Sequence, residues 1–303
     1  MPNGSTPEDP TPHAPSAQRE ARLSALKAVF IVPYFAGHAA ILAWGAWAVF
    51  GGAPALPWAG ALLSSGAVTI LLASLYSFRV PRTSVHLPWL LAAAGLGLPL
   101  AAAGAVTAPA AGIVPLAFAL WGAVTTPTYV FWYSRFGRER AAALAVGRRL
   151  PEFPLTTLDG ARVSSRTLLG QPTLFVFHRG AWCPVCIAQL KELSDSAEAF
   201  AARGCRLVSL SPQPAGFSKA LARRLGGLDY YADPDLEAAR ILGIFQAEGV
   251  PAGFRKLGFG SDTVLPTVTL VDAAGVVLLS DEPDNYRQRP APERFLRLLD
   301  APT

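Results

Sequence analysis

Four long apolar stretches without a single Asp, Glu, Lys or Arg lie in the first half of this 303-residue chain. They cover residues 29–50, 58–78, 88–106 and 113–133, and each is close to the roughly 20 residues that a helix needs to cross a bilayer. The alternative is a soluble helical bundle, but four uncharged stretches leave no polar face for water. The sequence therefore predicts four transmembrane helices.

The basic residues indicate the orientation of these spans. Lys and Arg precede the first span, separate the second from the third and follow the fourth, whereas loops 51–57 and 107–112 contain none. The positive-inside rule then predicts a multi-pass cell-membrane protein with both ends in the cytoplasm. If the Ala- and Gly-rich third stretch failed to insert, the C-terminal half would lie on the other side. The net charge of +5 comes with arginines beside apolar segments, which favours a lipid bilayer and not nucleic acid as partner.

Composition divides the chain into four parts. Residues 1–20 are expected to form a disordered tail, 21–134 the transmembrane domain, 135–149 a basic linker and 150–303 a globular domain. We expect the linker to leave the membrane as a helix, with its arginines either on lipid head groups or in solvent. His38, deep in the first span, either packs through hydrogen bonds or lines a site.

The most informative motif is His-Arg-Gly-Ala-Trp-Cys-Pro-Val-Cys at residues 178–186. It follows an apolar stretch at 173–177 that predicts a buried strand, and it precedes a helical pattern that ends near Gly204. A cysteine in the first turn of a helix lies near free N–H groups and the positive end of the dipole, which stabilise a thiolate. Cys183 and Cys186 can also close into a disulfide. The motif therefore predicts a redox pair.

We assign Cys183 as the nucleophile and Cys186 as the cysteine that resolves the intermediate. Arg179 and the helix terminus are expected to lower the pKa of Cys183, and His178 to add to this effect. Trp182 is expected to shield the site.

The alternative for the cysteine pair is a zinc half-site, which would need two more Cys or His ligands. His178 is the only nearby candidate, because Cys205 is predicted to begin a buried strand. We therefore expect neither a metal nor a cofactor.

The globular half alternates predicted strands and helices. Hairpins are expected around Asp159-Gly160 and at residues 273–275, and Asp233 is expected to cap a helix. The strands are expected at 173–178, 205–210, 228–231, 267–272 and 276–280, and the helices at 217–225 and 292–299. This order predicts an α/β domain with a central mixed sheet covered on both faces.

This order of elements, with Cys-x-x-Cys after the first core strand and Leu265-Pro266-Thr267 before a later strand, resembles the thioredoxin superfamily. The resemblance implies a cis Pro266 facing the disulfide beside Cys183. Three segments resemble the peroxiredoxin-like branch, which includes alkyl hydroperoxide reductase and thiol-specific antioxidant proteins: residues 150–155, 177–186 and 284–290. The match covers about residues 150–300.

Two features depart from typical peroxiredoxins, which carry Thr or Ser three residues before the peroxide-reacting cysteine and Pro four residues earlier still. Counted from Cys183, these positions hold Gly180 and Val176. Pro184, directly after the first cysteine, resembles the arrangement in glutaredoxins and disulfide oxidants more than that in thioredoxin. In the tail segment, Arg287 and Arg289 either reach the active site or lie on the surface.

These observations predict a membrane-anchored thiol oxidoreductase that uses the Cys-x-x-Cys pair. Its substrate would be a protein thiol or disulfide or a hydroperoxide, and a dithiol reductant would reset the pair. The alternative is a non-enzymatic redox sensor, in which the disulfide state changes how the helical half packs or binds a partner.

Overall fold

The computed structural model describes residues 14–77, 80 and 82–300. Its first half contains four long helices: α1 (Ala14–Phe50), α2 (Ala55–Leu75), α3 (Pro88–Thr107) and α4 (Pro109–Thr128), with α4 continuing as the short π-helix η1 (Tyr129–Tyr133). Each of the four predicted stretches thus forms a helix that is long and apolar enough to cross a membrane, although α2 ends at Leu75 and Phe78 lies outside the described residues. Residues 14–20 of the predicted tail belong to α1, and residues 1–13 lie outside the described part.

Small residues let α2 and α3 pack closely. A Cβ atom on Gly60 would lie 1.9 Å from the carbonyl oxygen of Gly97, and one on Gly104 would lie 2.4 Å from the Cα of Pro57. Close backbone approach of this kind is a common way for membrane helices to associate, because lipid offers no hydrophobic driving force between them.

His38 is completely buried between the helices. Its two ring nitrogens lie 3.1 Å from the Ser65 hydroxyl and 3.3 Å from the Thr125 hydroxyl. These contacts match the hypothesis of a hydrogen-bonded packing histidine.

The second half contains a seven-stranded mixed sheet in the order β2-β1-β5-β4-β3-β8-β9. Strands β3, β4 and β5 are parallel, and the other pairs are antiparallel. The strands are β1 (Pro154–Thr156), β2 (Arg162–Ser164), β3 (Thr173–Phe177), β4 (Arg206–Ser211), β5 (Asp229–Ala232), β8 (Thr267–Val271) and β9 (Val277–Asp281). β6 (Phe245–Gln246) and β7 (Thr263–Val264) form a separate pair. The predicted mixed sheet is confirmed.

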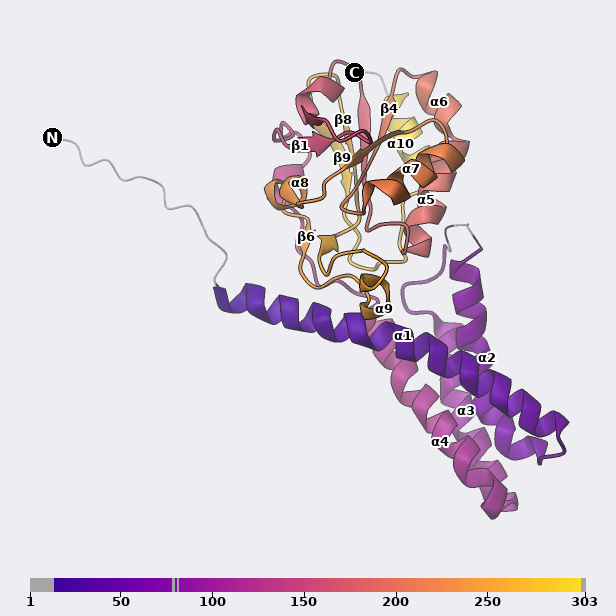
Figure 1. The fold of residues 1–303 in the computed structure, drawn as a ribbon. Helices are drawn as coiled ribbons and strands as arrows, with labels where there is room; N and C mark the ends of the chain where they lie inside the picture. Colours follow the sequence, from indigo (N-terminus) through magenta and orange to yellow (C-terminus); the bar gives the residue numbers. More distant parts are fainter. Residues whose placement is uncertain (1–13, 78–79, 81, 301–303) are drawn as a thin grey trace.

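Helices cover both faces of this sheet. The alternation of β3 sends Phe175 and Phe177 into one core, and Leu174 and Val176 into a second core on the other face. The helices are α5 (Pro184–Asp195), α6 (Ala197–Ala201), α7 (Ala215–Arg224), α8 (Glu237–Ile241), α9 (Ala252–Arg255) and α10 (Pro292–Leu299), with 3₁₀ turns η2 (Ala142–Leu144) and η3 (Ser165–Leu168). Figure 1 shows this domain over one end of the bundle, with α9 beside α1.

Both predicted hairpins form, but the cap at Asp233 differs from the prediction. α8 begins at Glu237, later than expected, and its N-cap residue is Leu236. The Asp233 carboxylate still accepts hydrogen bonds from the backbone N–H groups of Ala238 and Ala239. The acidic side chain therefore stabilises the helix start from a preceding turn.

The prediction of a helical linker at 135–149 was wrong, because this segment folds onto the α/β domain. Arg138 and Glu282 form a buried ion pair at 2.8 Å, with side chains only 3% and 4% exposed. Phe136 donates its backbone N–H to the carbonyl of Asp284, and Ala141 donates to Glu282. Residues that follow β9 thus accept the backbone hydrogen bonds that a helix would form with its own carbonyl groups.

Candidate active site

The turn between β3 and α5 carries the Cys-x-x-Cys motif. Gly180 has φ +131°, and a Cβ atom there would lie 3.0 Å from the Trp182 ring, so this position requires glycine. Cys183 is the N-cap residue of α5, and Pro184 occupies the first turn, where its missing N–H costs nothing. Cys186 lies one turn further along the same helix.

Both cysteines are buried against the helical bundle. Cys183 is 2% exposed and Cys186 1%, and both are free thiols. Their apolar cluster includes residues from the middle of α1 and from the adjoining ends of α2, α3 and α4, among them Tyr34, Leu71, Leu75, Leu87, Leu90 and Tyr129. The motif therefore faces the helical bundle and not open solvent.

The two thiols differ in their contacts. Burial opposes ionisation of Cys186, but a hydrogen bond from the Cys183 thiol, the charge of Arg289 and the backbone N–H of Arg179 outweigh it. Together they lower the pKa of Cys186 to about 6. The nearest guanidinium nitrogen of Arg289 lies 4.0 Å from the Cys186 sulfur.

The expectation that the pKa of Cys183 is lowered was wrong. Burial raises the pKa of Cys183 well above its ordinary value, and its hydrogen bond to Cys186 and the nearby Cys186 charge raise it further. The charges of Arg179 and Arg289 offset this only in part. As N-cap residue, Cys183 also makes no side-chain hydrogen bond to the free N–H groups of α5. The helix terminus therefore does not hold its sulfur as an anion.

Arg179 lies between the motif and the bundle. Its guanidinium carbon is 4.6 Å from the Trp182 ring centroid and 5.5 Å from that of Phe136, and one terminal nitrogen donates to the carbonyl of Gly249 at 2.5 Å. Trp182 is itself 8% exposed. These stacked groups close the site beside α9.

His178 does not supply the positive charge expected of it. The side chain is 2% exposed, and burial lowers its pKa to about 3. Its ring is therefore neutral at physiological pH, and its role is limited to packing at the end of β3.

Pro266 lies at the expected edge of the sheet, but the predicted cis bond was wrong. None of the described peptide bonds is cis. Thr267, the next residue, pairs with Phe177 at the end of β3, where the motif begins. The Pro266 carbonyl accepts a hydrogen bond from Arg138 at 3.2 Å. This trans bond follows the ordinary preference of X–Pro peptides.

Neither tail arginine is exposed, but only Arg289 lies beside a cysteine, with its guanidinium 4.0 Å from the Cys186 sulfur. Arg287 is fully buried and donates to the Thr83 hydroxyl and the Val85 carbonyl, both at 2.9 Å. It therefore joins the tail segment to the loop between α2 and α3. Nothing in the local pattern around residues 284–290 predicts this contact with a loop two hundred positions away.

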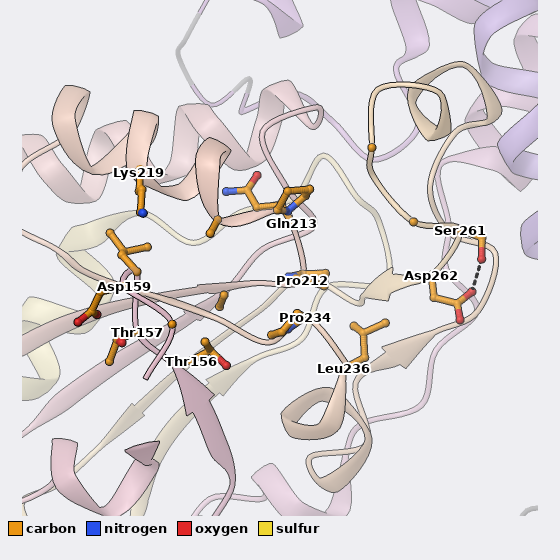
Figure 2. A pocket seen from close by; sticks show the side chains of 17 residues that line it. Thr156, Thr157, Asp159, Pro212, Gln213, Lys219, Pro234, Leu236, Ser261 and Asp262 are labelled. Carbon is orange, nitrogen blue, oxygen red and sulfur yellow. Dashed lines mark hydrogen bonds between the residues drawn. The ribbon is translucent and has the colours of Figure 1, made fainter. Parts of the chain in front are cut away.

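A cavity of about 640 Å³ lies beside the motif and not at the thiols. It opens at the carboxyl ends of β4 and β5, between the β1–β2 hairpin and residues 258–262, and Figure 2 shows Gln213 on its wall. The Gln213 amide oxygen accepts from the backbone N–H of Ala181 at 2.7 Å. Sequence reasoning missed this glutamine, which connects the cavity wall to the motif.

The zinc alternative lacks a donor set. Within the described ranges, no group of three His, Cys, Asp or Glu residues lies close enough to hold a metal ion. Cys205 is 5% exposed and packs in the core with Leu174 and Leu207, and burial raises its pKa to about 12. It is thus a core residue, as the sequence predicts.

Comparison with known proteins adds a family match. The model of the AhpC/TSA family matches residues 146–280, while no curated protein matches the chain. Reduced Prx3 from Vibrio vulnificus is 22% identical with a TM-score of 0.45, over 52% of this chain and 99% of that chain. Peroxidoxin BcpB from Mycobacterium tuberculosis is 20% identical with a TM-score of 0.41, over 54% and 97%.

Proposed function

We propose that this chain is a membrane-anchored thiol peroxidase, on the premise that residues 146–280, which match the model of the AhpC/TSA family, form a peroxiredoxin-like domain. The observation that carries the proposal is the paired sulfurs at the start of α5, with the Cys186 sulfur beside Arg289. The four apolar helices support the membrane anchor. The positions of Lys and Arg support a cytoplasmic redox domain.

The contacts favour Cys186 as the nucleophile, in place of Cys183. Cys186 has the lowered pKa and is therefore the thiolate near neutral pH. Cys183 stands three residues earlier, at the position that carries Thr or Ser in typical peroxiredoxins, and its thiol donates a hydrogen bond to the Cys186 sulfur. Cys183 thus occupies the place of the missing hydroxyl.

In the proposed reaction, the Cys186 thiolate attacks one peroxide oxygen and the O–O bond breaks. The leaving oxygen takes a proton, and Cys186 becomes a sulfenic acid. Cys183 then attacks the Cys186 sulfur, which releases water and forms the disulfide. A dithiol donor restores the two thiols.

Peroxide turnover by the purified full chain tests this proposal. With a dithiol donor and cumene hydroperoxide, Cys186→Ser is expected to abolish peroxide consumption. Cys183→Ser is expected to complete one round and leave an oxidised Cys186 that mass spectrometry detects. If Cys183→Ser is not oxidised by peroxide while Cys186→Ser still is, Cys183 and not Cys186 is the nucleophile.

A non-enzymatic redox sensor is the second candidate, favoured by the burial of both sulfurs against the ends of the spans. A sensor would consume one equivalent of peroxide without cycling, whereas an enzyme consumes many.

A topology reporter fused after Thr303 tests on which side of the membrane the redox domain lies. A cytoplasmic signal is expected.

A further inference from the structure

Three buried arginines surround the cysteine pair and its junction with the bundle. Arg179, Arg287 and Arg289 are 6%, 0% and 8% exposed. Among the described residues, none of the three has a carboxylate within 4.0 Å, and each has an Nε atom without a hydrogen-bond partner. A buried charge is costly unless an opposite charge accompanies it.

Asp281 does not form an ion pair with these arginines. The charge of Arg289 acts on its carboxyl group, but the carboxylate accepts a 2.7 Å hydrogen bond from Arg294. Arg287 is held by neutral oxygens of the loop at residues 83–85. The junction therefore carries buried positive charge that the carboxylates of the described residues leave uncompensated.

The Cys186 sulfur is the group placed to provide the negative charge. It lies 4.0 Å from Arg289, and it accepts hydrogen bonds from the backbone N–H of Arg179 and from the Cys183 thiol. This negative charge exists only in the reduced protein. Closing the disulfide removes it and leaves the arginines without a counter-charge.

We propose that the disulfide between Cys183 and Cys186 is a strong oxidant, which accepts electrons readily from thiols and does not pass them to protein disulfides. The inference rests on the proposed use of this pair as the redox centre. A dithiol–disulfide couple becomes more oxidising when its reduced form is stabilised. Here the buried arginines stabilise the reduced form and destabilise the oxidised one.

Two donor thiols supply the two electrons that reduce the disulfide. They belong either to one protein dithiol or to two molecules of a small thiol. One donor thiolate attacks a sulfur of the pair, the S–S bond breaks, and Cys186 leaves as a thiolate. The second donor thiolate attacks the mixed disulfide, and Cys183 takes up a proton as it leaves. The donor becomes a disulfide, and hydroperoxide reoxidises the pair as proposed above.

A redox titration of the full chain in detergent micelles tests the proposal. The protein is equilibrated with reduced and oxidised glutathione, and the fraction of disulfide is measured by mass after alkylation. The equilibrium constant is expected to favour the reduced pair at least tenfold more than thioredoxin does under the same conditions. Arg289→Met is expected to shift the constant about tenfold toward the disulfide, which is about 30 mV for this two-electron couple.

Two further variants separate charge from folding. Arg289→Lys keeps a positive charge and is expected to retain most of the wild-type constant. Arg203→Met removes a surface charge paired with Asp300 and is expected to leave the constant unchanged. A wild-type constant equal to that of thioredoxin, or equal shifts in Arg289→Met and Arg203→Met, would overturn the inference. Peroxide turnover is measured separately, so an oxidising pair without turnover contradicts only the proposed function.

Discussion

At the scale of single residues, the hydrogen bond between the two thiols decides which sulfur carries the charge. Both side chains are almost fully buried, so burial alone would keep both as neutral thiols. Cys186 accepts the hydrogen bond and also interacts with a backbone N–H and with the Arg289 guanidinium, while Cys183 keeps its proton and donates it to the hydrogen bond. The asymmetry therefore comes from these three interactions and not from the position of either residue in the helix.

The pH dependence of thiolate absorbance in the reduced full chain tests this asymmetry. Because the pKa of Cys186 is lowered to about 6, the thiolate signal is expected to be lost as pH falls through about 6. Cys183→Ser retains a donor and is expected to keep this midpoint, whereas Cys183→Ala removes the donor and is expected to raise it. Equal midpoints in the Ser and Ala variants would rule out the hydrogen bond as the cause.

At the scale of elements, the sequence predicted the helices and turns whose conformation depends on neighbouring residues. Uncharged runs of helical length predicted α1 to α4, and Asp159-Gly160 predicted the β1–β2 hairpin, because these depend on residues close in sequence. The linker at 135–149 was different. Its conformation depends on Glu282 and Asp284, which are distant in the chain, and no periodicity around residue 138 contains that information.

The buried pair between Arg138 and Glu282 leads to a stability prediction for this linker. Arg138→Met leaves a buried carboxylate without its partner, and we expect a loss of about 3–5 kcal/mol in the free energy of unfolding. The matched control is Arg162→Met, which breaks an exposed pair with Glu237 and is expected to cost about 1 kcal/mol or less. Thermal unfolding of the full chain in detergent measures both. Similar losses in the two variants would contradict a structural role for the buried pair.

At the scale of the whole molecule, the arrangement of the two halves was beyond sequence reasoning. The motif predicted a redox pair, but its burial against the bundle arises from contacts among Tyr286, Arg287 and residues of the four long helices. An exposed polar contact lies at the rim of this apolar centre, where Arg82 and Glu192 form a two-pronged ion pair at 2.9 Å. An apolar core within a polar rim is the usual anatomy of a protein interface.

This arrangement predicts that the junction controls access to the thiols. In a Cys205→Ala background, a bulky maleimide is expected to modify the wild-type pair slowly, because both sulfurs are buried. Arg287→Met removes the hydrogen bonds to Thr83 and Val85 and is expected to increase the rate at least tenfold. Glu192→Gln weakens only the exposed rim and is expected to change it less.

Arg203→Met is the control for this experiment, since its exposed ion pair with Asp300 involves no residue of the junction and its rate should equal that of wild type. Circular dichroism and gel filtration identify a variant that has unfolded, because unfolding would also expose core residues. If folded Arg287→Met reacts no faster than Arg203→Met, the thiols are reached by a route that does not require separation of the two halves. Access would then depend on the motif loop, where Arg179 and Trp182 close the site, and not on the junction.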